Sequence, residues 1–281
     1  MNILITGEKG YLSNRIGKYC ESMGHRVYYV SLRNDDFLRY KYEGIDVVFH
    51  VAGVVPQKSI TPEVFYEVNY EKTKQLFDII LKCSGVSRFV YLSTMATYGA
   101  KTMRKNGCAI DLDTEQCPIS DYGKSKMLAE QYIVAHQKGI KTTILRVPTL
   151  YDSVKCEYFD FYKKLLSKLP CIPYIKANTK RSVLHIDNLC FLMEKIASGA
   201  ICESVVLPCD KYIPDVNIIM KKVADETKIK KKTSRILGLT LEIAYKLHPV
   251  LSNLVGNAYY SDSCALLIDK KSIFDFCYNE E

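Results

Sequence analysis

Tyr122 and Lys126 are the residues of this sequence best suited to chemistry, because they lie four positions apart in the stretch SDYGKSKMLAE. Side chains four residues apart on a helix share one face, so a helix here would place the lysine ammonium beside the phenol. A neighbouring positive charge favours the phenolate and lowers the phenol pKa from about 10. We therefore expect Tyr122 to act as an acid or base toward a hydroxyl or a ketone.

A second group of candidates comes at the end of the apolar stretch SRFVYLST, which predicts a buried strand over Arg88–Ser93. Thr94 follows this strand, and its hydroxyl could orient a substrate oxygen, with Ser93 as the alternative. The YGKSK spacing alone also fits a turn of a surface helix. The preceding strand and the order of the other elements favour the catalytic interpretation.

The elements that must position these residues alternate along the first half of the chain. Alternation of this kind predicts an α/β fold, a Rossmann-type doubly wound parallel sheet with helices on both faces. In such sheets the ligands bind at the carboxyl ends of the strands. Strands are expected at Met1–Thr6, Arg26–Leu32, Asp46–Val51, Arg88–Ser93 and Thr142–Val147, and helices at Leu12–Ser22, Pro62–Cys83 and Asp121–His136.

The stretch TGEKGYLS joins the first strand to the first helix and resembles a phosphate-binding turn. Gly7 permits the tight turn, and Gly10 lets the backbone approach a pyrophosphate at the helix N-terminus, where Tyr11 and Leu12 would contribute. Ser13 stands where a third glycine is expected, and we expect it to loosen the packing of helix on strand. A plain structural turn is the alternative for this motif.

Residues at the end of the second strand bear on the choice of dinucleotide. Ser31 and Arg33 stand where a carboxylate would indicate NAD, and this pair suits the 2′-phosphate of NADP. The alternatives are that Arg33 is a surface charge and that Asp35 or Asp36 reaches the adenosine. The cofactor is therefore NAD or NADP, with NADP favoured. Further cofactor contacts are expected at the end of the third strand, at Val51, Ala52 and Gly53, and from Tyr122 and Lys126, of which Lys126 would hold the nicotinamide ribose.

The composition excludes several classes of protein. The 281 residues are 48% hydrophobic and 25% charged, and they contain no apolar run of the ~20 residues that a membrane-spanning helix needs. The net charge of +8 comes from dispersed lysines, which fits an anionic small ligand, and we expect no nucleic-acid partner. Eleven cysteines without a C-x-x-C pair predict free thiols, no metal site and a reducing compartment. The N-terminus shows no signal-peptide pattern, which also favours the cytoplasm.

The second half of the chain has a less regular pattern, which predicts a smaller, mixed C-terminal portion for substrate binding. We expect a dinucleotide-binding domain over residues 1–151, to which 182–195 return, and a substrate-binding portion over 152–181 and 196–281. Helices are expected at Phe159–Leu169 and Ile236–Leu247.

The stretch KIKKKTSRILGLTLEIAYKL, at residues 228–247, joins a basic run to an amphipathic helix. A segment of this kind can lie on an anionic membrane surface. The alternative, which we favour from the sequence, is a helix that covers the substrate cleft and is preceded by solvated lysines.

Taken together, these motifs resemble an extended short-chain dehydrogenase/reductase of the nucleotide-sugar epimerase and dehydratase type. The resemblance covers nearly the whole chain and implies the same fold, an NAD or NADP cofactor, and proton transfer by Tyr122 with Lys126 and Thr94 beside it. The stretches that carry it are TGEKGYLS, VFHVAG, NYEKT, STMATYG, YGKSK, RVPTLYD and RSVLHIDNL.

The resemblance also implies a substrate, a nucleotide-activated sugar. Arg181 would contact its diphosphate, and Thr149 stands where the family often has an asparagine that faces the sugar nucleotide. A guanidinium matches phosphate oxygens in a fork, although Arg181 could instead pair with a local carboxylate. Residues 142–190 are most similar to a branch in bacterial surface-polysaccharide pathways. Homodimers are common in the family, and the sequence leaves the oligomeric state open.

The reaction is narrowed by Met95 and Ala96, which follow Thr94 where the family's dehydratases have two carboxylates. Neither side chain carries a proton, so dehydration is not expected. Epimerisation and ketone reduction, at C4 of the sugar, both remain: NADP favours a reductase and the family favours an epimerase. The alternative to an enzyme is a catalytically silent dinucleotide-binding sensor or scaffold of the same fold.

Overall fold

A computed structural model describes residues 1–57, 59–99, 109–152, 157–176, 179–247 and 258–272. The chain forms two compact units. Unit 1 consists of Met1–Gly99, Glu115–Val147 and Leu189–Leu207, and unit 2 consists of Ala100–Thr114, Pro148–Asn188 and Pro208–Glu281. The assignment of the second unit to substrate binding stays a prediction.

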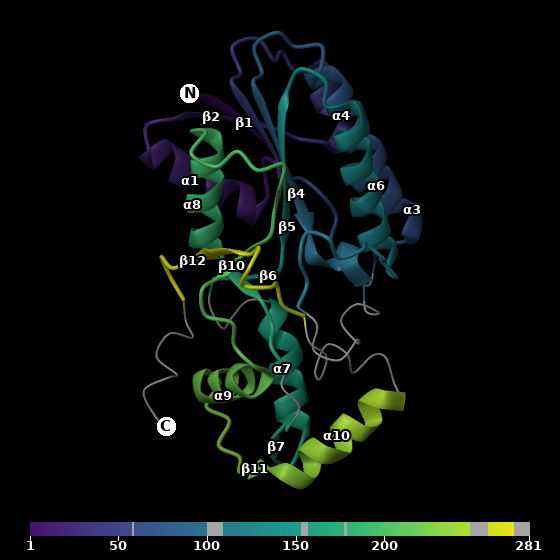
Figure 1. The fold of residues 1–281 in the computed structure, drawn as a ribbon, viewed down its shortest axis with the longest axis vertical. Coiled ribbons are helices and arrows are strands. Elements are labelled where there is room, and N and C mark those ends of the chain that lie inside the picture. The colour runs from purple at the N-terminus through teal and green to yellow at the C-terminus, as the bar shows by residue number, and fades with distance from the viewer. Residues whose placement is uncertain (58, 100–108, 153–156, 177–178, 248–257, 273–281) are drawn as a thin grey trace. The chain divides into compact units, whose positions relative to one another are not determined.

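Unit 1 is built on a six-stranded sheet in the order β2-β1-β3-β4-β5-β9, in which every neighbouring pair is parallel (Figure 1). The five predicted strands are present, and the sixth, β9, was not predicted because it is only two residues long. The strands are β1 (Asn2–Thr6), β2 (Arg26–Val30), β3 (Val47–His50), β4 (Arg88–Thr94), β5 (Lys141–Val147) and β9 (Val205–Val206).

Helices cover both faces of this sheet, which confirms the predicted doubly wound parallel fold. Figure 1 shows α1 and α8 on one face and α3, α4 and α6 on the other. A short 3-10 turn, η1 (Arg33–Asp35), and the helix α2 (Asp36–Arg39) follow β2. The remaining bounds are α1 (Tyr11–Ser22), α3 (Pro62–Phe65), α4 (Lys72–Ile80), α6 (Asp121–His136) and α8 (Ile186–Ala197).

The predicted helix Pro62–Cys83 is interrupted. Between α3 and α4 the chain forms a π-helical stretch, η2, over Tyr66–Glu71. Such stretches often occur at functional sites. Asn69, near its end, is buried.

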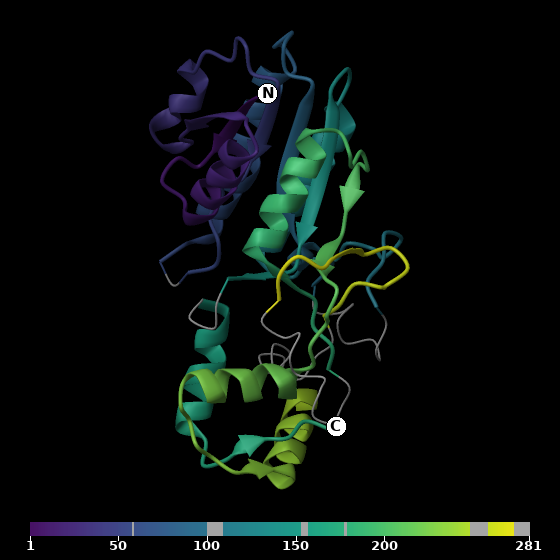
Figure 2. The same cartoon turned by 90° about the vertical axis from the view of Figure 1, so that its left-hand side faces the viewer.

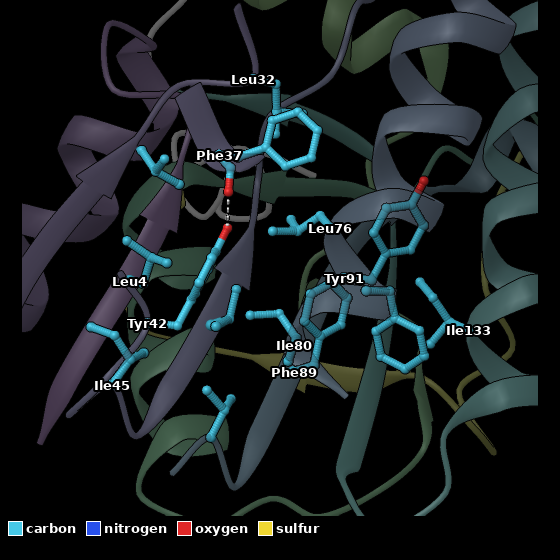
Figure 3. Packing of buried hydrophobic residues seen from close by; sticks show 14 of the residues in the cluster. Leu4, Leu32, Phe37, Tyr42, Ile45, Leu76, Ile80, Phe89, Tyr91 and Ile133 are labelled. Carbon is cyan, nitrogen blue, oxygen red and sulfur yellow. Dashed lines mark hydrogen bonds between the residues drawn. The ribbon is translucent and has the colours of Figure 1, made fainter. Parts of the chain in front are cut away.

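The main core of unit 1 explains why β3 and β4 are almost uninterrupted apolar runs. Leu4, Phe37, Leu76, Phe89 and Ile133 belong to one buried cluster, which draws on the sheet, α2, α4 and α6 (Figure 3). Strands of a parallel sheet are covered on both faces, so nearly every side chain along them is apolar. This packing fixes the strand ends that carry the candidate site.

Within the described residues, unit 2 contains three short parallel strand pairs and three longer helices. The helices α7 (Glu157–Lys168) and α9 (Val216–Glu226) share a second apolar core, and α10 (Arg235–Leu247) packs near them (Figure 2). Neither α9 nor the short strands were predicted. The strand pairs are β6 (Thr149–Tyr151) with β8 (Val183–His185), β7 (Ile172–Pro173) with β11 (Thr233–Ser234), and β10 (Pro208–Asp210) with β12 (Leu266–Ile268).

The cysteines among the described residues are free thiols. In that part of the chain, no cluster of three or more histidine, cysteine and acidic residues is arranged to hold a metal ion. No helix that the structure describes is both long and apolar enough to span a bilayer.

Candidate active site

Tyr122 and Thr94 are brought together by a close approach of α6 to the end of β4. The Ser120 hydroxyl accepts a hydrogen bond from the Gly123 amide at 3.1 Å, which starts the helix at Asp121 as predicted. At Gly123 an added Cβ would lie 2.6 Å from the Ala96 carbonyl oxygen, so a side chain there would push the helix away. The result is that the Thr94 hydroxyl lies near the Tyr122 phenol and lowers its pKa.

The predicted lowering of the Tyr122 pKa is wrong for this structure. Burial raises the pKa of Tyr122 above its ordinary value, and the nearby Thr94 hydroxyl opposes this only in part. The Lys126 ammonium is directed elsewhere, toward the carbonyl oxygen of Leu92 at 2.9 Å. Tyr122 is therefore protonated at neutral pH, the form that can donate a proton to a substrate oxygen.

Lys126 is a buried cation held by the backbone and by an aromatic face. Its side chain is among the buried polar groups, and its Nζ lies 4.7 Å from the centre of the Tyr91 ring. Burial lowers the pKa of Lys126 to about 8, although the Glu130 carboxylate raises it. Lys126 therefore stays mostly charged at neutral pH and loses that charge only in mildly alkaline solution.

His50, at the end of β3, is the centre of a hydrogen-bond chain in which the donor and the acceptor of each bond can be assigned. Thr6 Oγ1 accepts from the amides of Val51 at 3.1 Å and Ala52 at 2.9 Å, so its own proton points to His50 Nδ1, 2.8 Å away. His50 Nε2 therefore carries the ring proton and donates to Thr73 Oγ1 at 2.7 Å. Burial, together with the Lys126 charge, lowers the His50 pKa to about 3, so the ring is neutral.

The π-helical stretch η2 places the Asn69 side chain against the loop that follows β3. The Asn69 amide accepts from the Val54 N–H at 2.8 Å and donates to the Val54 carbonyl at 3.0 Å and to Ser125 Oγ at 3.3 Å. An added Cβ on Gly53 would lie 2.9 Å from Asn69 Oδ1 and 3.3 Å from Lys126 Nζ. The loop thus passes directly over Lys126, with no room for a side chain.

The glycine turn after β1 has the features of a phosphate site. Gly7 has φ +93°, and an added Cβ there would meet Ala52 at 3.5 Å, so this turn and the loop after β3 are in contact. No side chain caps the first turn of α1 at Gly10, which leaves the helix N-terminus available to an anion. These residues fit the pyrophosphate of a dinucleotide.

Ser13 stabilises this turn through hydrogen bonds, although we expected it to loosen the packing of helix on strand. Its hydroxyl is hydrogen bonded to the carbonyl oxygens of Gly7 and of Gly10, the latter at 2.9 Å. Close packing of α1 on the sheet depends instead on Gly17, where an added Cβ would lie 1.8 Å from Tyr29 Oη. Tyr11 is exposed.

The predicted determinants of cofactor choice lie at the start of η1. Ser31 Oγ accepts from the Arg33 amide at 3.0 Å, and the Arg33 side chain is exposed. Asp35 is 3.0 Å from Lys72 Nζ, which also donates to the Leu32 carbonyl at 3.0 Å. The Asp35 carboxylate is thus already paired with Lys72, and contact of Ser31 and Arg33 with a cofactor phosphate stays a prediction.

Ser93 does not point to the same place as Thr94, because successive side chains on a strand alternate faces. The Ser93 hydroxyl is hydrogen bonded to the buried Glu130 carboxylate, which accepts from Arg146 Nε at 3.0 Å and Nη2 at 2.8 Å. Burial alone would lower the Arg146 pKa, but Glu130 and Tyr98 raise it above its ordinary value. The Ser93 hydroxyl therefore helps to hold the ion pair of Glu130 and Arg146, which joins α6 to β5.

The two remaining predicted substrate residues belong to unit 2. Thr149 begins β6 and is paired with Val183 of β8, two residues after Arg181. Arg181 is buried, and its amide donates to the Pro214 carbonyl at 3.0 Å. Unit 2 therefore holds Thr149 and Arg181 at the same end of one strand pair.

Sequence reasoning missed the roles of His50, Asn69 and Glu130. Each is a polar residue within an otherwise apolar or helical pattern, and each is almost fully buried. A buried polar group must find hydrogen-bond partners. A histidine inside the apolar stretch VFHVAG therefore indicates a buried, hydrogen-bonded side chain. The residues to which these three side chains are hydrogen bonded come from distant segments, so residue spacing in the sequence does not identify them.

The sequence of this chain is similar to that of known enzymes. The family model described as "NAD dependent epimerase/dehydratase family" matches residues 3–199, well over half of the chain. A UDP-glucose 4-epimerase of Vibrio cholerae is 28% identical over 212 residues, which cover 67% of this chain. A sterol-4-alpha-carboxylate 3-dehydrogenase (decarboxylating) of Dictyostelium discoideum is 25% identical over 218 residues, 66% of this chain. The match spans 64% of each relative's own length.

Among solved structures, the fold is similar to that of a UDP-glucuronic acid 4-epimerase from Bacillus cereus in complex with UDP-glucuronic acid and NAD. The TM-score is 0.68 at 17% identity, with 98% of this chain and 96% of that chain covered. At that identity the likeness concerns the fold.

Proposed function

We propose that this chain, which belongs to the NAD dependent epimerase/dehydratase family, transfers a hydride at a hydroxyl-bearing carbon of a nucleotide-activated sugar. The observation that supports this most directly is the nearness of the Thr94 hydroxyl to the Tyr122 phenol, at the end of a parallel strand. Ligands of doubly wound sheets bind at such ends. The buried Lys126 charge and the glycine turn lie in the same unit.

In this proposal Tyr122 moves the proton. Its raised pKa keeps the phenol protonated at neutral pH, so it can donate to the oxygen of a ketone as that ketone is reduced. In the reverse direction the Tyr122 phenolate takes the proton from a sugar hydroxyl and becomes the phenol again. Thr94 holds the same oxygen through its hydroxyl. NAD or NADP, when bound, supplies or accepts the hydride.

Lys126 supports this proton transfer electrostatically. A positive charge in a buried site stabilises negative charge that develops on a nearby oxygen. Its Nζ lies beside Gly53, under the loop where we place the cofactor with Gly7, Gly10 and Ala52. With a pKa of about 8, Lys126 provides that charge at neutral pH and not above about pH 9.

The proposed reaction is epimerisation or ketone reduction at C4 of the sugar. Met95 and Ala96 follow Thr94 in the structure as a 3-10 turn, and neither side chain can carry a proton for loss of water. The name of the Vibrio cholerae relative, UDP-glucose 4-epimerase, supports a sugar nucleotide and C4 chemistry. A place in cell-surface polysaccharide biosynthesis rests on the resemblance of residues 142–190 alone.

The experiment that tests the proposal is turnover of UDP-, dTDP-, GDP- and CDP-sugars and their 4-keto forms with NAD or NADP. We expect one nucleotide class to be converted, and Tyr122→Phe to lower kcat by about 10²- to 10⁴-fold while dinucleotide binding is kept. Tyr28→Phe, a change at a partly exposed tyrosine of β2, is the matched control.

Two outcomes contradict the proposal. Near-full turnover by Tyr122→Phe would show that the reaction does not use this phenol. Thermal stabilisation by a dinucleotide with no conversion of any sugar in either direction would favour the alternative, a silent dinucleotide-binding sensor or scaffold.

A further inference from the structure

The orientation of α10 in unit 2 is fixed by the residues on its inner face. An added Cβ on Gly238 would lie 1.7 Å from the carbonyl oxygen of Tyr174, so the two backbones are in direct contact. Leu241 packs against the apolar core of unit 2, and Glu242 accepts a hydrogen bond from the Lys176 amide. Figure 2 shows α10 beside β11 and β7. These contacts leave the opposite side of the helix facing outward.

That outer side carries a row of three large apolar side chains. Ile236, Leu239 and Ile243 are exposed by 79%, 57% and 54%. Their spacing of three and four residues places them on one stripe of the helix, a turn apart. Scattered exposed apolar residues are ordinary, but a contiguous row on one helix indicates a surface that binds something apolar.

The segment that leads into α10 is strongly basic. Residues 228–235 contain four lysines and one arginine and no acidic residue. Lys231 is used structurally, because its Nζ donates to the Leu166, Ser167 and Leu169 carbonyls at the end of α7. The other basic side chains of the segment are exposed: Lys228, Lys230, Lys232 and Arg235.

An exposed aromatic residue adjoins both features. Tyr174 is 43% exposed and lies under the Arg235 guanidinium, with 5.9 Å between the guanidinium carbon and the ring centre. Tyrosine is enriched where apolar and aqueous phases meet, because its ring is apolar and its hydroxyl is polar. The apolar row, the cations and this ring together form what we call the α10 face.

We propose that the α10 face docks on an anionic lipid bilayer. Ile236, Leu239 and Ile243 would enter the boundary between headgroups and acyl chains, while the exposed lysines meet lipid phosphates. Charge complementarity selects this partner over a second copy of the chain. A two-fold contact between two α10 faces would oppose basic segment to basic segment, which is repulsive.

Flotation of the full chain with lipid vesicles tests the proposal. We expect association with mixed phosphatidylglycerol and phosphatidylcholine vesicles, weakened by salt, and little with phosphatidylcholine alone. The combined change Ile236→Ser, Leu239→Ser and Ile243→Ser should abolish it. Each single Lys→Glu change at the exposed lysines should weaken binding by about fivefold or more. Ile119→Ser, a change at a residue 57% exposed in unit 1, is the matched control.

A second measurement avoids reliance on the triple variant's folding. The chain contains no tryptophan, so Leu239→Trp introduces a single fluorophore on the α10 face. Its emission should shift to the blue on addition of the anionic vesicles, while that of Ile119→Trp should not. No flotation and no shift, equal binding to both kinds of vesicle, or a dimer that the triple serine variant dissociates would each overturn the proposal.

Discussion

Unit 1 and unit 2 use their buried polar groups differently. In unit 1, Asn69 and Glu130 each join two or more elements at the strand ends where the candidate site lies. In unit 2 the comparable group is Asp210, which accepts from Tyr151 Oη at 2.5 Å and from Asn188 Nδ2 at 2.7 Å. Tyr151, Asn188 and Asp210 all belong to unit 2, and none of them was singled out as a substrate contact.

The difference suggests a division between chemistry and recognition. The reacting groups of unit 1 stand on long elements whose register and hydrogen bonds leave them little freedom. Of the predicted recognition residues of unit 2, Thr149 begins a strand of three residues, and Arg181 lies two residues before another such strand, in an isolated bridge to Ala258. We therefore expect changes in unit 1 to affect cofactor binding and kcat, and changes in unit 2 to affect substrate affinity.

The largest expected effect concerns the stability of unit 1 in acid. His50 has a pKa of about 3 in the folded chain and about 6.5 in an unfolded one, so the unfolded state binds more protons between these values. The stability that His50 contributes is complete above pH 6.5 and is lost as the pH falls toward 3. The loss has an upper bound of roughly 4 to 5 kcal/mol.

Urea unfolding from pH 7 to pH 4 measures this loss in wild type and in His50→Asn. The variant should be less stable at pH 7 but should show a flatter dependence on pH, because it lacks the titrating ring. His136→Asn, at an exposed histidine of α6, should retain the wild-type slope. Parallel slopes for all three proteins would show that His50 does not govern the acid response.

The second prediction concerns the glycine turn. Gly10→Val places a branched side chain where an added Cβ already lies 2.7 Å from Ser13 Oγ, at the helix end where we place the pyrophosphate. Dinucleotide affinity should fall by about 100-fold or more, the equivalent of about 3 kcal/mol. Titration calorimetry with NAD and NADP measures it. Gly85→Val, at an exposed glycine with room for a side chain, should bind as wild type does.

The third prediction tests unit 2 directly. Arg181→Lys keeps the charge but removes the guanidinium fork, so KM for the nucleotide sugar should rise about 10- to 100-fold with little change in kcat. Steady-state kinetics separate the two constants, and Lys180→Arg is the neighbouring control. A fall in kcat at unchanged KM would place Arg181 with the reacting groups and remove the proposed division between the units.

The sequence predicted the sheet of unit 1 well because its signals are local. Apolar runs marked five of the six strands, and α6 begins and ends where the spacing placed it. The proximity of Tyr122 and Thr94 also followed from the order of elements. The direction of the Tyr122 pKa did not, because it depends on burial and on where the Lys126 ammonium points, and both are set by distant backbone.

Unit 2 was predicted less well for a physical reason. Strands of two or three residues are too short to show a periodic pattern, and they are specified by long-range pairing such as that of β7 with β11. The helix α9 does have a helical pattern and a cap, in which Asp215 accepts from the Ile218 amide at 2.9 Å. Its absence from the prediction was a missed local signal.

The smallest expected effect concerns the preference of unit 1 for NADP or NAD. Arg33 is exposed just after β2, and its amide is held by Ser31 Oγ, so its guanidinium is available to a 2′-phosphate. Arg33→Ala should weaken NADP by about five- to tenfold and leave NAD nearly unchanged, since only NADP carries that phosphate. Because the site is exposed, the difference should shrink with added salt. Arg39→Ala, an exposed basic residue of α2, is the control. Equal loss for both dinucleotides, or none, would make Arg33 a surface charge and leave NAD as the better assignment.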